Sequence, residues 1–362
     1  RPKPVVARGT APMKPLTRLR HPLPRMRGRG KGEGASLAAC VFRCLADGRF
    51  HSGEDLAREL AVTRSAIWKA AAALRSLGLE IFAVRNRGYR LRSACEPLDD
   101  ARIRDGLSQR AREHLASLEV EWALASTNDA LLARPPPRAG SAAAVFAEHQ
   151  SAGRGRRGRA WLAPPGGAIC LSLSWTFPEV PRDLSALSLV IGVCVLRALR
   201  DLGARELELK WPNDVLCAHR KLVGVLIELR AESAGPTSAV IGIGLNCAIA
   251  PKLRAAIAAT GLEPADLADA GVDAARRNEV AARVLDACIL GLQEFERDGA
   301  RAFLEEWQRA DALRDRTVTV HFAEGASRGV ARGVDLTGAL LIEAPDGVRK
   351  FISGDITVRF DA

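Results

Sequence analysis

The chain has 362 residues, of which 48% are hydrophobic and 26% charged, a balance typical of a globular protein with a real core. No apolar run approaches the ~20 residues that span a bilayer, and the basic start lacks the apolar core of a secretory signal, so we expect a cytoplasmic protein without membrane contacts. The eight cysteines form no Cys-x-x-Cys pair, which favours buried thiols over a zinc site or a set of disulfides.

The net charge of +11 is unevenly distributed along the chain. Residues 1–34 carry ten Lys or Arg and one acid, residues 35–95 carry ten and five, and the remainder carries 33 and 36. Residues 1–34 also contain many Pro and Gly and lack apolar periodicity, so we predict a disordered basic tail. The positive charge of residues 35–95 is more informative, because it falls on a folded domain.

Residues 35–95 predict a winged helix-turn-helix domain. The expected elements are a helix from Leu37, a helix over 52–60 capped by Ser52, a helix over 64–77 capped by Thr63, and strands at 79–84 and 89–91. Caps, helical spacing and a final two-stranded hairpin appear in the order that this motif requires.

The third helix and the hairpin tip carry the candidate DNA-binding residues. We expect Arg64, Ser65, Lys69 and Arg75 to be exposed on the helix, and Arg85, Arg87 and Arg90 to face phosphates from the hairpin. The alternative is a small helical module with a solvated basic face. The helix sequence Ala70–Ala73 gives no clue to the DNA sequence that would be read.

Residues 96–312 predict an α/β domain on a mixed sheet, and residues 313–362 predict a small SH3-like β-barrel. In the first, strands are expected at 120–124, 144–148, 169–176, 222–229 and 239–245, and helices at 184–202 and 280–295. The alternation in 169–176 predicts a half-buried strand. In the second, strands are expected at 317–322, 327–334, 339–343 and 348–352.

The most specific motif is Gly153-Arg154-Gly155-Arg156-Arg157-Gly158-Arg159, followed by Trp161. Glycines let the backbone approach a ligand closely, and the guanidinium groups between them can neutralise a polyphosphate and a carboxylate together. A disordered arginine–glycine segment that binds nucleic acid is the alternative. Such segments occur as long repeats, whereas this motif occurs once, directly after a predicted strand.

Three further motifs are weaker in isolation. Lys210-Trp211-Pro212-Asn213-Asp214 offers a cation for phosphate and a carboxylate for Mg²⁺ around a rigid bend, or is a structural turn. Gly242-Ile243-Gly244-Leu245-Asn246 is suited to a strand packed directly on a flat ligand. Ser126-Thr127-Asn128-Asp129 is a polar step after a strand, or a helix cap.

In this order, the motifs resemble those of the biotin–protein ligases. The matching segments are Ser126-Thr127-Asn128, Gln150, the arginine–glycine loop, Lys210–Asp214, Arg220-Lys221-Leu222-Val223-Gly224 and Gly242–Asn246. The resemblance covers about residues 36–362, including the winged head and C-terminal barrel of the repressor-type enzymes. It therefore implies a bifunctional ligase and biotin operon repressor, with an α+β fold of three domains.

The resemblance also implies roles for individual residues. Ser126, Thr127, Asn128 and Gln150 would bind the biotin ring, with Gly242 and Gly244 as the pocket floor. The loop residues Gly153, Arg154, Gly155, Arg156 and Trp161 would bind the biotin carboxylate and the adenylate. Lys221 would contact the carboxylate or α-phosphate, while Lys210, Asp214 and Asn246 would handle phosphates and Mg²⁺. The residues expected to act in catalysis are Arg156, Lys210, Asp214 and Lys221.

The implied reaction uses ATP and biotin to form biotinyl-5′-AMP, then transfers biotin to a lysine of the biotin carboxyl carrier protein of acetyl-CoA carboxylase. Charge neutralisation and alignment would provide most of the catalysis. The other implied partners are operator DNA and a second copy of the chain once adenylate is bound. Two positions depart from the family pattern: His149 replaces a frequent aromatic residue, and Leu262 stands near a tryptophan that some repressor-type members place over adenine.

Three alternatives remain open at this point. A lipoate- or octanoate-transferring enzyme would share the catalytic fold, although it should lack both the four-arginine loop and the winged head. A biotin-sensing repressor without ligase activity would not need the complete set of polar residues found here. A ligase whose winged head regulates nothing is compatible with every motif in the sequence.

Overall fold

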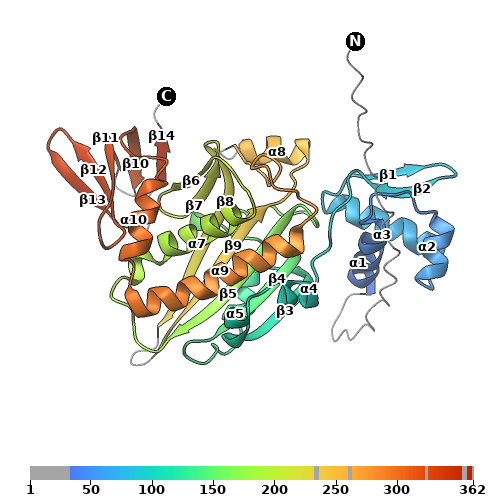
Figure 1. Ribbon diagram of the computed structural model, residues 1–362. Helices are drawn as coiled ribbons and strands as arrows, with labels where there is room; N and C mark the ends of the chain where they lie inside the picture. The colour runs from blue at the N-terminus through green and yellow to red at the C-terminus, as the bar shows by residue number, and fades with distance from the viewer. Residues whose placement is uncertain (1–32, 232–235, 260–262, 323–324, 353–356, 361–362) are drawn as a thin grey trace, which may run out of the picture. The chain divides into compact units, whose positions relative to one another are not determined.

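The computed structural model describes residues 33–231, 236–259, 263–322, 325–352 and 357–360. The predicted basic tail, apart from its last two residues, and Leu262 lie outside these ranges. Within them, none of the helices is long and apolar enough to cross a membrane. Figure 1 shows a head of short helices and a hairpin, a central sheet with helices, and a C-terminal antiparallel sheet.

The head contains the predicted winged helix-turn-helix elements. They are α1 (Glu33–Leu45), α2 (Gly53–Glu59), α3 (Arg64–Ser76), β1 (Ile81–Val84) and β2 (Gly88–Leu91), with the two strands antiparallel. Ser52 Oγ accepts the Asp55 N–H at 3.0 Å and Thr63 Oγ1 accepts the Ala66 N–H at 3.2 Å, as the cap predictions require. The core includes Phe42, Leu45 and Ile67, all fully buried.

The central domain is built on one seven-stranded mixed sheet, in the order β3-β4-β5-β9-β8-β7-β6. Its strands are β3 (Leu115–Leu124), β4 (Ala142–Gln150), β5 (Ala168–Phe177), β6 (Leu207–Lys210), β7 (Asp214–Cys217), β8 (Arg220–Ala231) and β9 (Thr237–Asn246). β3 and β4 are parallel and the other pairs antiparallel. The helical elements are α4 (Asp100–Asp105), α5 (Gln109–Glu113), α6 (Thr127–Leu132), η1 (Arg156–Gly158), η2 (Leu184–Ala186), α7 (Leu187–Asp201), α8 (Pro251–Ala258), α9 (Arg277–Asp298) and α10 (Arg301–Arg309).

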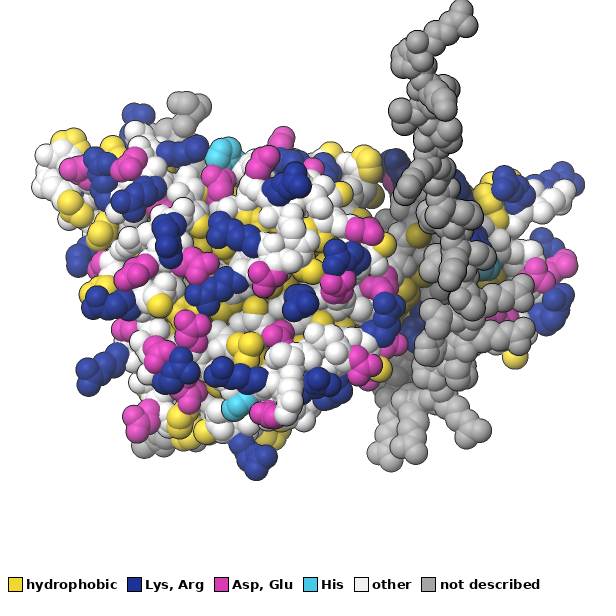
Figure 2. All heavy atoms as spheres, in the orientation of Figure 1, with side chains coloured by type: hydrophobic (Ala, Val, Ile, Leu, Met, Phe, Trp, Pro, Cys, Tyr) yellow, Lys and Arg dark blue, Asp and Glu magenta, His cyan; other side chains and the backbone are white. Residues whose placement is uncertain are grey.

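Different helices pack on the two faces of this sheet. The helices α7 and α9 lie across one face (Figure 1), where Leu171, Trp175 and Ile243 belong to a large buried cluster with residues of both helices. Basic and acidic side chains are interspersed over the surface of that layer (Figure 2). On the other face, Leu131 of α6 packs against Val145 and Val240. The short α6 leaves part of this second face available for a cavity.

The prediction of a half-buried strand over 169–176 is wrong. Every residue of β5 is buried, because the strand lies in the interior of the sheet and both of its faces are covered. Small polar side chains such as Ser172 and Ser174 occupy the face opposite the large cluster. Buried polar groups of this kind require hydrogen-bond partners, and those of Ser172 lie in the cavity described below.

A buried ion pair joins the start of this domain to the sheet. Arg277, at the beginning of α9, is fully buried and donates to both carboxylate oxygens of Glu148 in β4, at 3.2 and 3.0 Å. The guanidinium also donates to the carbonyl of Glu96, and the Glu148 carboxylate accepts the backbone N–H groups of Leu98 and Gly166. The segment that leads out of the head is therefore fixed by the same charges that join α9 to β4.

The C-terminal residues form a five-stranded antiparallel sheet in the order β13-β12-β11-β10-β14. Its strands are β10 (Thr317–Phe322), β11 (Gly325–Val334), β12 (Leu340–Ala344), β13 (Gly347–Phe351) and β14 (Thr357–Phe360). Four of them match predicted strands, and β14 was not predicted. Closure of this sheet into a barrel remains a prediction, as do the domain boundaries at residues 34, 95 and 312.

Candidate active site

A cavity of about 350 Å³ opens on the sheet face that carries α6. Its lining comes from segments spread over more than 130 residues of sequence. It includes the predicted site residues Ser126, Thr127, Asn128, Gln150, Arg154, Gly155, Arg156, Trp161, Lys210, Asp214, Lys221, Gly242, Gly244 and Asn246. Gly153 lies just outside the lining, where its carbonyl accepts the Trp161 N–H at 2.8 Å. The fold thus brings together the motifs of the central domain.

One end of the cavity is a network of buried polar groups. The Oε1 atom of Gln150, at the end of β4, accepts the Thr127 N–H at 2.8 Å and lies 3.2 Å from Thr127 Oγ1. The Ser172 hydroxyl lies 2.7 Å from Thr127 Oγ1 and donates to Asn128 Oδ1 at 2.5 Å. Ser126 both caps α6 and lines the cavity. This end can offer both hydrogen-bond donors and acceptors to a ligand.

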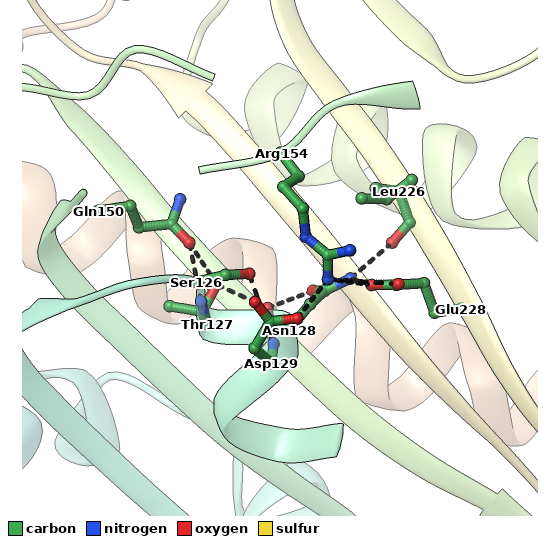
Figure 3. Close-up of polar contacts among 9 residues, drawn as sticks. Ser126, Thr127, Asn128, Asp129, Gln150, Arg154, Leu226 and Glu228 are labelled. Carbon is green, nitrogen blue, oxygen red and sulfur yellow. Dashed lines mark hydrogen bonds and ion pairs between the residues drawn. The ribbon is translucent and has the colours of Figure 1, made fainter. Parts of the chain in front are cut away.

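Two carboxylates flank this network (Figure 3). Asn128 Nδ2 donates to Glu228 Oε2 at 2.7 Å, and Arg154 Nη2 contacts both oxygens of the same carboxylate at 3.2 and 3.3 Å. Arg154 also forms an ion pair with Asp129. The first arginine of the glycine-rich loop is therefore held against the start of α6 and against β8.

Glycines form the floor of the cavity, because larger residues would collide with its walls. A Cβ atom at Gly242 would lie 2.5 Å from Asn128 Oδ1, and one at Gly244 would lie 2.4 Å from the ring of Trp161. The Trp161 ring therefore lies directly on the strand. Among the described residues, its buried Nε1–H has no hydrogen-bond partner, so a ligand oxygen could accept from it.

The rest of the loop carries cations at the other end of the cavity. Arg156 Nη1 lies 3.5 Å from Asn213 Oδ1, and Asn213 is in turn fixed by its Nδ2 donating to the Val225 carbonyl. Arg157 has a φ of 59°, an uncommon conformation for a residue other than glycine. The loop is thus turned so that several consecutive arginines reach the cavity.

The Lys210–Asp214 motif and Lys221 meet across β6, β7 and β8. Lys221 Nζ lies 2.7 Å from Asp214 Oδ1, and Lys210 is buried at the adjoining strand end. Asn246 Nδ2 donates to the carbonyls of Lys221 and Ala265, at 3.3 and 3.0 Å. Asn246 therefore orders the backbone around Lys221, a contact that its motif alone did not predict.

The charges of the lining strongly favour an anionic ligand. Among the residues that the structure describes, six cations line the cavity (Arg154, Arg156, Arg157, Arg159, Lys210 and Lys221) against one carboxylate, that of Asp214. Such an excess of positive charge in a concave site attracts and orients polyanions. Cys170, beside this site, is fully buried, and burial raises the pKa of its thiol to about 12, so it is a poor nucleophile.

Several residues of the site escaped the sequence analysis. Ser172 and Glu228 contact the predicted residues directly, and Asn213 and Asp129 were noted only as members of their motifs. Glu228 is an isolated acid inside the apolar run of β8, and such a position is itself a signal, because a partly buried carboxylate among apolar residues needs a polar partner. Ser172 gave a weaker signal, since serine is common on solvated strand faces.

In the head, Arg64, Ser65 and Lys69 of α3 are exposed, and so are Arg85 and Arg87 of the hairpin. Arg87 and Arg90 lie over the ring of Phe50, at 4.2 and 5.1 Å from the ring centre, which restrains their side chains. The prediction that Arg75 is an exposed face residue is wrong. Its Nε donates to the Ile81 carbonyl at 3.1 Å, so Arg75 fixes the helix to the hairpin.

Three family models match the chain: the biotin/lipoate A/B protein ligase family over residues 124–246, an HTH domain over 41–90, and the biotin protein ligase C-terminal domain over 315–359. The bifunctional ligase/repressor BirA of Salmonella typhimurium is 37% identical over 320 residues, covering 88% of this chain and 96% of that protein. The biotin–[acetyl-CoA-carboxylase] ligase of Mycobacterium tuberculosis is 34% identical over 72% of this chain and 95% of its own length.

Solved structures of biotin protein ligases also match the chain. The biotin protein ligase of Aquifex aeolicus in complex with biotin and ATP is 26% identical to this chain, with a TM-score of 0.55. The match covers 69% of this chain and all of the other. A mutant of the same enzyme in complex with biotin gives a TM-score of 0.56 at 26% identity, covering 68% of this chain and 99% of the other.

Proposed function

We propose a mechanism for this cavity, on the premise that the chain belongs to the biotin protein ligase family. Within that family it belongs to the bifunctional members, which carry a ligase and a repressor domain in one chain. It is a biotin protein ligase with a helix-turn-helix repressor domain, and its substrates are ATP and biotin. The observation that carries this function to the site is the pairing of a polar, buried end with six cations in one cavity. Biotin has a matching structure, with a ureido ring at one end and a carboxylate at the other.

The ureido ring belongs at the end formed by Ser126, Thr127, Gln150 and Ser172. A ureido group needs acceptors for two N–H groups and donors for one carbonyl, and the hydroxyls and amides there provide both. The valeryl chain would then run along the strand at Gly242 and Gly244, beside the Asn128 amide and the Trp161 ring, which lie against these two glycines. This orientation directs the carboxylate toward Arg154, Arg156 and Lys221.

Adenylation joins two anions, so its main obstacle is charge. The biotin carboxylate attacks the α-phosphorus of ATP, a C–O–P mixed anhydride forms, and pyrophosphate leaves. We assign Arg156 and Lys221 to the carboxylate and α-phosphate, and Lys210 to the leaving pyrophosphate, because these three cations line the cavity. Held in place before the reaction, they stabilise the charge that develops in the transition state.

Magnesium would enter with the nucleotide. The described residues contain no group of three or more His, Cys, Asp or Glu side chains that could hold a metal ion. Magnesium commonly uses one or two carboxylates together with substrate phosphates, and Asp214 is a carboxylate in the lining. We therefore assign Asp214 as its protein ligand, where the ion would neutralise triphosphate charge.

In the second half-reaction, the amine of an acceptor lysine attacks the acyl carbon of the adenylate, and AMP leaves with the bonding electrons. The acceptor we propose is the biotin carboxyl carrier protein of acetyl-CoA carboxylase. No enzyme nucleophile is required, because the mixed anhydride is already activated.

Isotope exchange between pyrophosphate and ATP tests the first half-reaction. With the purified full-length chain, exchange is expected to require biotin and magnesium and to be absent with lipoate or octanoate. Exchange that depends on lipoate and ignores biotin would contradict the assignment and favour the lipoate branch of the family.

For the head, we propose that Arg64, Ser65 and Lys69 enter a groove of operator DNA while Arg85 and Arg87 contact phosphates. Fluorescence anisotropy on DNA upstream of the host's biotin-synthesis genes should show tighter binding with biotin plus Mg-ATP than with either alone. Adenylate-bound protein is expected to sediment as a dimer. Equal, strongly salt-dependent binding to operator and scrambled DNA would reduce the head to a non-specific basic domain.

A further inference from the structure

Glu228 stands in an unusual position for a carboxylate. It lies in β8, in an otherwise apolar sequence between Ile227 and Leu229, and its side chain is 28% exposed. Cross-strand pairing places Leu226 opposite Gly242 and Glu228 opposite Val240. Residues two apart on a strand share a face, so Glu228 is on the cavity face, one step beyond the lining residue Leu226.

Its first contact determines how the amide of Asn128 is oriented. An ionised carboxylate only accepts hydrogen bonds, so the atom of Asn128 that faces Glu228 at 2.7 Å must be Nδ2. Asn128 Oδ1 then faces the Ser172 hydroxyl, which donates to it at 2.5 Å. Figure 3 shows Asn128 between Glu228 on one side and the polar end of the cavity on the other.

This orientation propagates along the network. A serine hydroxyl has one proton, and Ser172 uses it on Asn128. The Thr127 hydroxyl, 2.7 Å from Ser172 Oγ, is then the donor in that bond, and because it too has one proton, it has none left for Gln150 Oε1 at 3.2 Å. Gln150 presents its Oε1 to the Thr127 N–H. The acceptor-only end at Glu228 thus determines which atoms of the ring-binding end remain as donors and which as acceptors.

The second contact concerns Arg154. Its guanidinium lies between Glu228 and Asp129, so the same carboxylate that orients Asn128 also holds the first arginine of the loop. Asp129 contacts Arg154, and its backbone N–H is accepted by Ser126 Oγ at 3.4 Å. Glu228, by contrast, contacts both Arg154 and Asn128. Glu228 therefore links the polar end of the cavity to its cationic loop.

We propose that Glu228 is a positioning residue for biotin: it orients the Asn128 amide, and through Ser172 and Thr127 it sets the direction of the hydrogen bonds that receive the ureido ring. The inference rests on the proposed placement of biotin with its ring at this end. Glu228 does not have to touch the substrate. Its effect should fall on recognition of biotin and leave recognition of ATP largely intact.

The test is a donor–acceptor exchange in the full-length chain. Glu228→Gln retains the size of the side chain and allows the amide to present an N–H to Asn128, so the biotin KM should rise about 10-fold or more while kcat and the ATP KM change by less than about threefold. Asn128→Asp alone would bring two carboxylates together and should also raise the biotin KM.

Combining Asn128→Asp with Glu228→Gln restores one donor facing one acceptor, with the acceptor for Ser172 kept. The double variant should return the biotin KM to within about fivefold of the unaltered chain, well below the product of the two single effects. Glu119→Gln is the matched control. Glu119 lies in strand β3 of the same sheet and pairs with Arg134, but it does not line the cavity.

Two results would overturn the proposal: a biotin KM for Glu228→Gln within twofold of the unaltered chain, or a double variant no better than the product of the singles. If Glu228→Gln does not fold, the double variant alone decides, because only an orienting role predicts its recovery. Biotin-dependent exchange by the unaltered chain, measured beside them, establishes the ligase reaction separately from the role of Glu228.

Discussion

The two ends of the cavity are built on different principles. At the ring end, Thr127, Asn128 and Ser172 are buried and bonded to one another across α6 and β5. At the phosphate end, Lys221 is partly exposed and paired with the carboxylate of Asp214. Fixed hydrogen bonds discriminate between neutral groups of different shape, whereas ion pairs near the surface can exchange one anion for another at small cost. Specificity and charge stabilisation are thereby assigned to separate parts of one site.

The largest effect should come from Asp214→Ala at the phosphate end. The change removes the proposed magnesium ligand and leaves Lys221 without its carboxylate neighbour, so biotin-dependent pyrophosphate exchange should fall by about 10²–10³-fold. Initial rates of exchange at saturating biotin and ATP measure it. Exchange within threefold of the unaltered chain would remove Asp214 from the catalytic set and weaken the division between the two ends.

Arg156→Gly tests whether the loop retains the intermediate. Loss of a guanidinium that faces the adenylate should speed dissociation of biotinyl-5′-AMP by about 10–100-fold, the value of one charge-assisted hydrogen bond. Adenylate that escapes would label exposed lysines of unrelated proteins. Stopped-flow dissociation and labelling of an added bystander protein give the two readouts, and an unchanged dissociation rate would argue against a retaining role.

Gly242→Ala tests the ring end by filling space. The added Cβ would come within 2.5 Å of Asn128 Oδ1, so Asn128 must shift and its hydrogen bond to Ser172 must weaken. We expect the biotin KM to rise about 10-fold, with the ATP KM nearly constant. Equal increases in both KM values would mean that the two ends are coupled and that the comparison is too simple.

Asp311→Asn should change the stability of the fold without affecting either end of the cavity. Burial raises the pKa of Asp311 to about 7, so between about pH 4 and 7 the folded chain holds a proton that the unfolded chain has lost. The free energy of unfolding then falls as pH rises through that window. Since asparagine can still accept the Leu313 N–H, the variant should gain on the order of 1 kcal/mol at pH 8 and nothing at pH 4.

Thermal melts of this variant at pH 4 and pH 8, beside the unaltered chain, measure the difference. Its KM values should match those of the unaltered chain at either pH. A gain of the same size at both pH values would show that the titration of Asp311 does not contribute to stability.

The sequence predicted which residues form the site better than it predicted the contacts between them. Glycine-rich loops and motifs such as Lys210–Asp214 are local, so their chemistry can be recognised from neighbouring residues. The contact between Asn128 and Glu228 spans 100 residues and depends on the register of β8 against β9, which no local pattern specifies. For the same reason, Ser172 was placed on a half-solvated face, although the cavity network buries it.

In the head, caps and helix boundaries followed from short-range chemistry and were confirmed within a few residues. The role of Arg75 did not follow, because its partner is a backbone carbonyl of the hairpin. A helical wheel shows which side a residue occupies, but not what covers that side. Fold class and motif order were therefore predictable, while the partners of individual polar groups required the folded chain.

The buried pair of Arg277 and Glu148 has a practical consequence for dissecting the protein. Because Arg277 relies on the Glu96 carbonyl and Glu148 on the Leu98 N–H, a headless fragment should begin before Glu96 to keep the ligase half intact. A cut after Leu98 would strip partners from two buried charges, and such a loss can cost several kcal/mol. Limited proteolysis of the segment between the head and the ligase domain should accordingly cleave on the N-terminal side of Glu96.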